Sequence, residues 1–220
     1  MSEIQQIRLS LPLRMGKVNC YLLRVGQEFA LIDCGSKNRR RELAQTLAAA
    51  GVAPGKLKAI LLTHGDFDHT ANGAYLRRQF GGGIGIGEAD AAMASDGNMF
   101  ANRKQPNWVI RKLVPLLFGF GIGERFQPDF LLSEGQSLEA YGVPLRVVGL
   151  PGHSKGSVGF LTDEGELFSG DLLENVSGVG LSTIMDNLEE ADASLEKVRG
   201  LGATMIYPGH GEPFPASALP

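Results

Sequence analysis

The hydrophobic positions near the start of the chain follow the pattern of strands. Apolar and polar residues alternate over 7–13, and two short apolar runs at 18–24 and 29–33 flank Gly26. Alternation with a period of two is typical of a half-buried strand, and two runs joined at a glycine are typical of a β-hairpin. We therefore predict one strand followed by a hairpin.

Helical spacing begins after the hairpin. Leu43 and Leu47 lie one helical turn apart, and Gly51 follows as a helix-ending glycine, so a helix is predicted over 38–50. The continuous apolar run 57–63 then predicts a strand that is buried on both faces.

The second half of the chain repeats the order of the first. Its segments are strand-like runs at 145–148, 158–162 and 166–169, an amphipathic helix over 188–201, and a short strand at 205–207. Each half therefore runs from hairpin to helix to buried strand. In each half an Asp within two residues of a Gly follows the hairpin (Asp33, Asp171), and a His beside Gly follows the buried strand (His64, His210). The matching order predicts an α/β sandwich of two pseudo-duplicated halves.

The segment between the halves, about 88–130, fits neither pattern. It contains the single Trp of the chain, Trp108, and an apolar stretch over 109–120. It is predicted to be a helical insertion, which either packs on the core or forms a lid or wall over a site. The substrate-binding residues are unknown at this stage, and the guesses within the insertion are Asn102, Arg103, Lys104 and Trp108.

Length and charge narrow the class of protein. At 220 residues one domain over 1–220 is expected, and the net charge of 21 − 24 = −3 indicates no strong attraction to nucleic acid or to an anionic membrane. The sequence has no apolar run long enough for a membrane helix and no signal-peptide pattern at its start, so a cytoplasmic location is expected. The expected partner is a small-molecule substrate, and a homodimer is left open.

The two cysteines allow a prediction about register. If the hairpin loop comprises residues 26–28, paired positions sum to 54, and Cys20 lies opposite Cys34. In a reducing compartment both are expected to be free and buried rather than joined in a disulfide. A two-residue loop would break this pairing.

All four histidines of the chain fall in glycine-containing turns near carboxylates. The segment Thr63-His64-Gly65-Asp66-Phe67-Asp68-His69 places four potential metal ligands in six positions directly after a buried strand. His153, His210 and Asp171 also lie beside glycines that follow apolar runs. Because strand ends converge at one edge of a sandwich, we expect these side chains to meet there.

These segments resemble the metallo-β-lactamase superfamily of metallohydrolases, whose signature loop is Thr-His-x-His-x-Asp-His. The resemblance runs in order through LIDCGS, THGDFDH, PGHSKGS, SGD and YPGHGEP. It implies a four-layer αββα sandwich, which agrees with the two-half pattern, and a pair of divalent metal ions as cofactors.

The resemblance also implies a role for each site residue. The first metal position would be formed by His64, Asp66 and His153, the second by Asp68, His69 and His210, with Asp171 as a bridge and Asp33 supporting the ligands from behind. Two metals would hold and deprotonate a water, and Asp68, beside that water, would be the catalytic residue that orients it and moves its proton.

The sequence departs from the signature at one position, because Asp66 stands where the family has a second His. Asp66 could bind a metal directly, bind it through water, or leave the first position weak or empty. Zinc is the expected metal, and iron or manganese is left open because the carboxylate of Asp66 hardens the site. Flavodiiron members of the superfamily also carry a carboxylate here, but 220 residues leave no room for their flavin domain.

The predicted function is hydrolysis of a small ester, thioester or lactone by a metal-bridging hydroxide. The alternatives are a phosphodiesterase, an iron-dependent thiol or persulfide dioxygenase, and a non-catalytic metal-binding module. β-Lactamase activity is not expected, because those enzymes are exported and no export signal is found.

Overall fold

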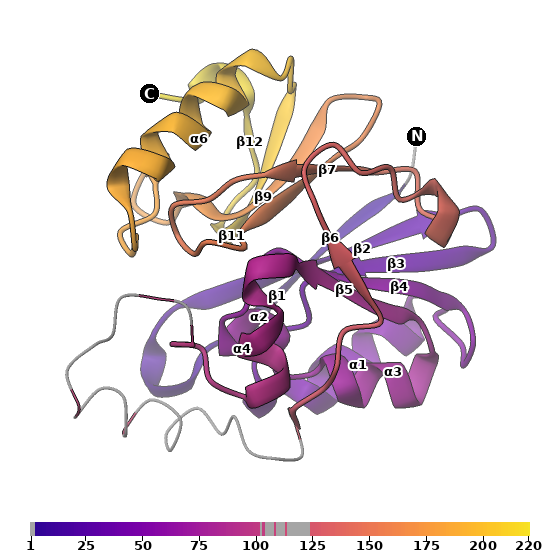
Figure 1. Ribbon diagram of the computed structural model, residues 1–220. Helices are drawn as coiled ribbons and strands as arrows, with labels where there is room; N and C mark the ends of the chain where they lie inside the picture. The colour runs from indigo at the N-terminus through magenta and orange to yellow at the C-terminus, as the bar shows by residue number, and fades with distance from the viewer. Residues whose placement is uncertain (1–2, 102, 104–107, 109–112, 114–123) are drawn as a thin grey trace.

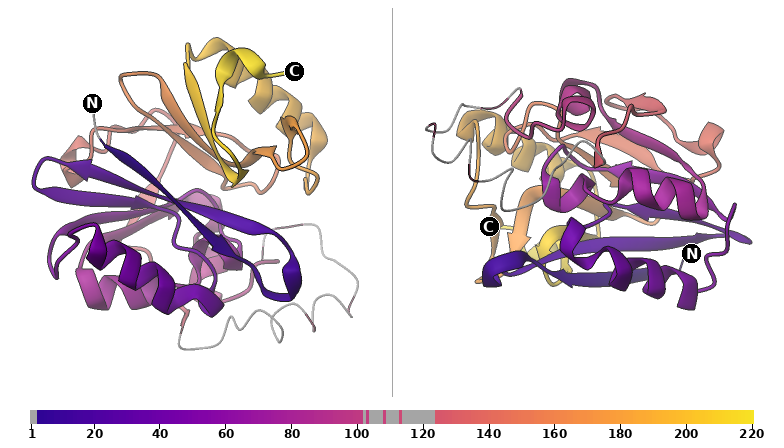
Figure 2. Two further views of the ribbon diagram at one scale, coloured as in Figure 1. Left: turned by 180° about the vertical axis from the view of Figure 1, so that it is seen from behind. Right: turned by 90° about the horizontal axis from the view of Figure 1, so that it is seen from below.

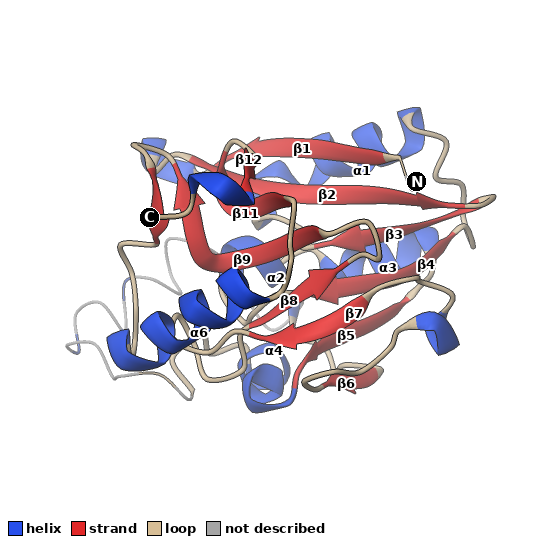
Figure 3. Cartoon of the chain, turned by 90° about the horizontal axis from the view of Figure 1, so that it is seen from above, coloured by secondary structure: helices blue, strands red, loops and turns tan. Residues whose placement is uncertain are grey.

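Two β-sheets pack face to face, and helices cover their outer sides (Figure 1). The computed structural model describes residues 3–101, 103, 108, 113 and 124–220. Seen from above, the strands of the two sheets run in similar directions, with α6 lying over the second sheet (Figure 3). Such alignment is usual for twisted sheets packed face to face.

The first sheet has the strand order β1-β2-β3-β4-β5-β6. The strands are β1 (Ile4–Ser10), β2 (Lys17–Val25), β3 (Glu28–Ile32), β4 (Leu57–Leu62), β5 (Gly83–Gly87) and β6 (Phe130–Leu132). The first three are antiparallel, and β3 to β6 are parallel. The helices α1 (Arg40–Ala49) and α3 (Gly73–Phe80) connect the parallel strands and lie on the outer face (Figure 1).

The second sheet has the order β12-β11-β9-β8-β7, with β10 paired to β9. Its strands are β7 (Arg146–Gly149), β8 (Val158–Leu161), β9 (Glu166–Asn175), β10 (Val179–Leu181), β11 (Met205–Gly211) and β12 (Phe214–Pro215). The helix α6 (Leu188–Gly200) covers the outer face of this sheet (Figure 1).

The pairing of strands confirms the predicted duplication. In each half two antiparallel pairs come first, β1-β2-β3 and β7-β8-β9. A helix then leads to a strand that lies parallel to the third, which gives β3 with β4 and β9 with β11. The chain is therefore the αββα sandwich that the order of its segments indicated.

Three apolar layers separate the four layers of secondary structure. Leu43 and Leu47 of α1 pack with the outer face of the first sheet, and Leu195 of α6 packs with that of the second. The layer between the sheets contains aromatic and aliphatic side chains from both, among them Tyr21, Ile32, Leu61, Phe160 and Phe168. Because both faces of each sheet are buried, many of its strands appear in the sequence as continuous apolar runs.

Several elements differ from the sequence prediction. β9 and β11 extend to Asn175 and Gly211, so Asp171 and His210 lie within strands instead of in turns after them. β5 and β6 were not predicted, because the segment GIGIG of β5 carries only two apolar side chains and β6 has only three residues. The pairing of β11 with β9 shifts register twice between Tyr207 and His210, which explains why the pattern there did not look like a strand.

The predicted insertion at 88–130 begins with helical structure. A 3₁₀ turn, Glu88–Asp90, leads into α4 (Ala91–Asp96), and Phe130 already belongs to β6. Asn102, Lys104 and most of the stretch 109–120 lie outside the described residues.

The predicted opposition of Cys20 and Cys34 is wrong. Val25 pairs with Glu28, so the hairpin turn has two residues and paired positions sum to 53. Gly26 adopts a φ of 62°, the left-handed conformation that a tight two-residue turn requires. Cys20 and Cys34 are nevertheless both free and buried, as expected.

The two ends of the first sheet differ in their connections. The tight β2–β3 hairpin lies at one end, and the longer β1–β2 connection lies at the opposite end (Figure 2).

In the part of the chain that the structure describes, no helix combines the length and the hydrophobicity of a membrane span.

Replacing Phe160 with Ala should remove the largest side chain that β8 contributes to the apolar layer between the two sheets. Because the side chain is fully buried, we expect the free energy of unfolding to fall by about 3–5 kcal/mol. Denaturant unfolding followed by circular dichroism measures it. The control is Leu188→Ala, whose side chain is 66% exposed and whose loss should change stability by at most about 0.5 kcal/mol. Equal effects in the two variants would contradict the layer arrangement.

Candidate metal centre

Four segments far apart in the sequence bring their polar residues to one place between the sheets. The segment from the end of β4 into α2 (Phe67–Thr70) carries His64, Asp66, Asp68 and His69. The other residues come from the β7–β8 connection, from β9 and from β11, and they are His153, Asp171 and His210. All except His210 are buried.

The carboxylate of Asp171 lies at the centre of the group. Its oxygens lie 3.2 Å from Nε2 of His210, 3.4 Å from Nε2 of His69 and 3.8 Å from Nε2 of His64. Nε2 of His153 is 4.0 Å away. One carboxylate is therefore within 4.0 Å of all four imidazoles, which is the convergence that the positions of the histidines led us to expect.

Each imidazole is held from behind through its Nδ1 atom. The partners of Nδ1 are Thr63 Oγ1 for His64 (2.9 Å), Asp33 Oδ2 for His69 (2.8 Å), the Ile184 carbonyl for His153 (2.7 Å) and the Lys17 carbonyl for His210 (2.7 Å). Such partners orient the rings of metal-binding histidines and leave Nε2 for the metal. All four Nε2 atoms face the common centre.

The ligand atoms fall into two sets. His64, Asp66 and His153 form the set that we call the first position, and Asp68, His69 and His210 form the second position. Within each set the nearest ligand atoms lie within 4.8 Å of one another. A third group, His64, His69 and Asp171, links the two. The seven predicted ligands are thus brought together, while their binding of metal stays a prediction.

Buried atoms without partners show that the donor set suits a cation. Nε2 of His64, Nε2 of His69 and Oδ1 of Asp171 have no hydrogen-bond partner among the described residues. An unsatisfied buried polar atom costs about 1–3 kcal/mol, so three together call for a ligand. Two imidazole nitrogens and a carboxylate oxygen are preferred donors for zinc and for iron. The residues therefore fit the divalent metals that the resemblance implies.

The backbone beside the carboxylate is shaped for this arrangement. A Cβ atom at Gly209 would lie 2.0 Å from Oδ1 of Asp171 and 3.0 Å from the ring of His69. Only glycine leaves room here, so the PGH segment of β11 lets the main chain approach the carboxylate closely.

The charges of the centre are strongly coupled. Burial opposes ionisation of Asp171, yet His210 and His69 hold the pKa of its carboxyl well below the usual value. Burial also opposes protonation of His210, but the Asp171 carboxylate raises its pKa to about 9. His64 differs, since burial and the neighbouring His69 lower its pKa. Burial raises the pKa of Asp68.

Asp33 lies behind the histidines, as the resemblance implied. It is 2% exposed and accepts hydrogen bonds from the amide and hydroxyl of Thr63, in addition to its contact with His69. Its φ of 55° is in the left-handed region, which is unfavourable for a residue other than glycine. Strain of this kind persists where surrounding contacts impose it, and here those contacts orient a candidate ligand.

Asp90 was not predicted as part of the site, but it joins two of its loops. Its carboxylate accepts hydrogen bonds from the Gly65 amide (2.9 Å), the Ser154 hydroxyl (2.6 Å) and the Gly156 amide (2.9 Å). It therefore ties the loop of His64 to the loop of His153. A lone Asp at the start of an insertion carries no sequence signal for this role.

Arg103 was a guess for a substrate contact, and the structure places it against a predicted ligand. Its Nη1 donates to both oxygens of Asp66, at 2.5 and 2.6 Å, and its Nη2 donates to the His153 carbonyl at 2.6 Å. On the other side, its Nε donates to Asp186 at 3.1 Å. Trp108 is 72% exposed and is not among the residues that line the cleft beside the centre.

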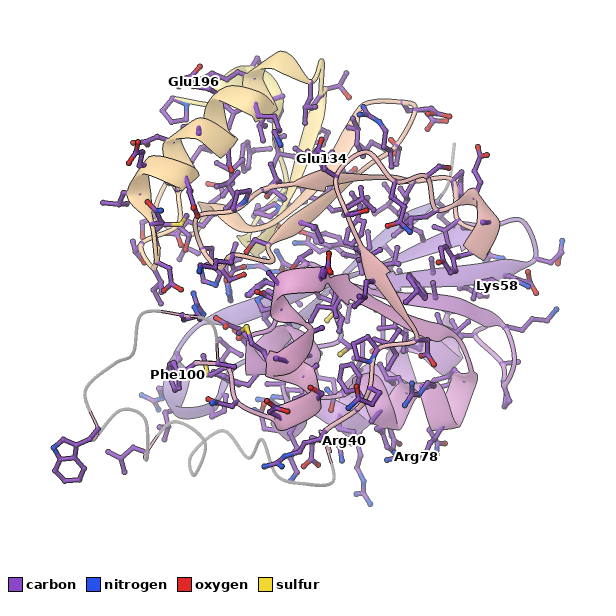
Figure 4. The ribbon with its side chains drawn as sticks, viewed as in Figure 1. Arg40, Lys58, Arg78, Phe100, Glu134 and Glu196 are labelled. Carbon is purple, nitrogen blue, oxygen red and sulfur yellow. The ribbon has the colours of Figure 1, made fainter. Side chains whose placement is uncertain are left out.

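A cleft of about 730 Å³ opens from the metal centre. Its floor is polar and includes Asp66, Asp68, His153, Asp171 and His210. Its walls are largely apolar and include Leu11, Met15, Phe67, Met99, Phe100, Val176 and Ile184. Figure 4 shows Phe100 beside α4, and Phe100 is one of the residues that line the cleft. The cleft can hold a molecule with an apolar part and a polar reacting group.

Comparison with known proteins agrees with this geometry. Residues 13–210 match the family model of the metallo-beta-lactamase superfamily, and the chain belongs to that superfamily. A crystal structure of the protein TTHA1623, in a di-iron-bound form, is 28% identical, with a TM-score of 0.73 over 97% of this chain and 96% of that one.

Two curated relatives are named as hydrolases. An atrochrysone carboxyl ACP thioesterase of Aspergillus fumigatus is 32% identical over 88% of this chain and 50% of its own length. A hydroxyacylglutathione hydrolase of Anaeromyxobacter dehalogenans is 30% identical over 94% of this chain and 66% of its own length. The chain thus spans between half and two thirds of these relatives.

Replacing Asp90 with Asn should loosen the contact between the two ligand-bearing loops. The amide oxygen of Asn can still accept from Gly65 and Ser154, but its NH₂ group then faces the Gly156 amide, so a buried donor loses its acceptor. We expect a loss of about 1–3 kcal/mol in the free energy of unfolding and weaker metal binding, measured by denaturant unfolding and by metal titration. Asp96→Asn, at an exposed position in the adjoining helix α4, is the control and should behave as the wild type.

Metal binding at pH 7 should release protons. His210, with a pKa of about 9 before metal binding, carries a proton at pH 7, and a metal needs the neutral imidazole. The affinity should therefore rise with pH and level off above about 9. Calorimetry in buffers of different ionisation enthalpy counts the protons, and His210→Gln should release fewer. A binding enthalpy that does not change with the buffer would contradict the assignment.

Proposed function

We propose that this protein is a metal-dependent hydrolase that cleaves a thioester, or a related ester or lactone, with an apolar acyl part. The observation that carries the proposal is the set of unpartnered ligand atoms, from His64, His69 and Asp171, at the base of an apolar-walled cleft. The names of the two curated relatives, a thioesterase and a hydroxyacylglutathione hydrolase, support a thioester.

The walls of the cleft fit the acyl part of such a substrate. Phe67, Phe100 and Ile184 offer apolar surface beside the polar floor, and Met15, Val176 and Ile184 are more than half exposed, at 53%, 64% and 65%. Covering exposed apolar side chains with an apolar ligand removes their surface from water, which favours binding of that ligand. An acyl chain along this wall would present its carbonyl carbon to the centre.

The centre would supply two kinds of chemistry. A divalent ion held by these residues would act as a Lewis acid and lower the pKa of a water towards about 7. Asp68 lies on the floor of the cleft, with Oδ2 3.6 Å from Nε2 of His210 and 3.8 Å from Nε2 of His69. Burial raises its pKa, which makes it a better proton acceptor than an ordinary carboxylate.

The proposed reaction then assigns a task to each group. Asp68 orients the attacking water, takes its proton and passes it to the leaving group. The imidazoles, held from behind by Asp33, Thr63 and the carbonyl groups, keep the centre rigid while charge moves from water to the thioester oxygen. A thiolate is a good leaving group, so little further assistance is needed.

The metal is proposed to be zinc, with iron or manganese as the alternatives. The imidazoles and carboxylates suit zinc, and the carboxylate of Asp66 in place of an imidazole favours the harder ions. The di-iron form of the related TTHA1623 supports iron as a metal worth testing. Protein reconstituted separately with each of the three ions decides among them.

The test is hydrolysis of a glutathione thioester, an aliphatic acyl thioester, a lactone and a phosphodiester by reconstituted protein. We expect turnover of a thioester that is lost on chelation. Asp171→Asn should abolish it, and Asp68→Asn should slow it by about 10²- to 10⁴-fold when the rates are expressed per bound metal ion. Asp192→Asn, an exposed carboxylate on α6, is the matched control and should leave the rate unchanged.

Other outcomes would overturn the proposal. Turnover of the phosphodiester alone would indicate a phosphodiesterase, and oxygen uptake with a thiol substrate would indicate a dioxygenase. Bound metal with no turnover of any class would favour a non-catalytic metal-binding module.

A further inference from the structure

Arg103 is held inside the first metal position. Its side chain is 5% exposed, and it contacts two of the three residues that form that position. Nη1 donates to both oxygens of Asp66, while Nη2 lies 3.2 Å from Nε2 of His153 and donates to the carbonyl oxygen of the same residue. The guanidinium therefore lies against the atoms that a first metal ion would bind.

The two metal positions differ in this respect. At the second position and the bridge, His69 Nε2 and Asp171 Oδ1 are buried without a partner in the described part of the chain. At the first position both oxygens of Asp66 are already engaged, and only Nε2 of His64 is unpartnered. At the first position a guanidinium thus occupies carboxylate lone pairs that a metal needs, whereas at the second position Asp68 faces the imidazoles of His69 and His210, which can lose a proton when a metal binds.

A guanidinium and a divalent ion cannot share these atoms. Arg is always positively charged and offers only donors, so it cannot itself coordinate a metal, and it would repel one placed beside it. Asp186 holds Arg103 from the opposite side through a hydrogen bond to Nε. Because the guanidinium is anchored at both edges, an ion that enters the first position must break a buried, charge-assisted pair.

We propose that Arg103 is a built-in competitor for the first metal position, so that the resting protein holds one divalent ion, at the second position. The guanidinium supplies the positive charge beside Asp66 that a second ion would otherwise supply. A second ion binds only when it displaces Arg103 from Asp66 and His153. The inference rests on the metal centre of the proposed function, but it makes no assumption about the substrate.

The experiment counts metal ions instead of turnover. Chelator-treated wild type and Arg103→Met are titrated with Mn²⁺ by calorimetry, and Mn²⁺ electron paramagnetic resonance distinguishes single ions from spin-coupled pairs. Wild type should bind one ion at least about tenfold more tightly than a second and show an uncoupled signal. Arg103→Met should bind the second ion about tenfold or more tightly than wild type does and show the coupled signal.

A matched control separates this effect from the general loss of an arginine. Arg77 makes an ion pair with Asp129 away from the centre, at 2.8 Å, so Arg77→Met should titrate as the wild type does. If Arg103→Met does not fold, Asp186→Asn serves in its place. It removes the negative charge that holds Arg103 from the outer side, leaves all seven candidate ligands intact, and should tighten binding of the second ion in the same direction.

Two results would overturn the inference. One is a wild type that binds two ions with similar affinity and a coupled signal. The other is an Arg103→Met or Asp186→Asn variant that folds and still holds only one ion. Failure of the hydrolysis assay with these metal counts intact would reject the proposed substrate class and leave the role of Arg103 standing.

Discussion

The structure of this site depends on one buried carboxylate among four imidazoles. Asp171 lies within 4.0 Å of Nε2 of every histidine in the chain, although burial by itself would oppose its charge. Charges in a protein interior persist only when they are paired, so the carboxylate and the histidines stabilise one another's charged forms. Everything around them serves to keep that arrangement fixed.

That support comes from the backbone as much as from side chains. The register shifts in β11 and the absence of a side chain at Gly209 bring the main chain up to Asp171. Asp33, in a strained conformation, orients His69, and Asp90 joins the loops of His64 and His153. A centre made from four segments is held to one geometry because each segment is tied to another by buried hydrogen bonds.

The replacement of the usual histidine by Asp66 gains a physical meaning from Arg103. A carboxylate in this position can pair with a guanidinium, which an imidazole would do poorly, and Asp186 completes the set of charges around that guanidinium. The change at one ligand thus belongs to a group of three charged residues. Within this group the positive charge beside Asp66 comes from a guanidinium, whereas in a site built only from ligands and metal it would come from the ion.

The sequence by itself determined most of the order of elements, the duplicated sandwich and the candidate metal-ligating residues. Apolar periodicity and the positions of the few histidines can both be read from the sequence without knowledge of tertiary contacts. Only the tertiary structure decided the hairpin register of Cys20, the pairing of Arg103 with Asp66 and the role of Asp90. The register of Cys20 depends on one residue more or less in the hairpin loop. The contacts of Arg103 and Asp90 join residues that lie between 25 and 66 positions apart in the sequence, and no local pattern encodes such pairs. The physical reason is that charge pairing and packing act through space, whereas a sequence shows only neighbours along the chain.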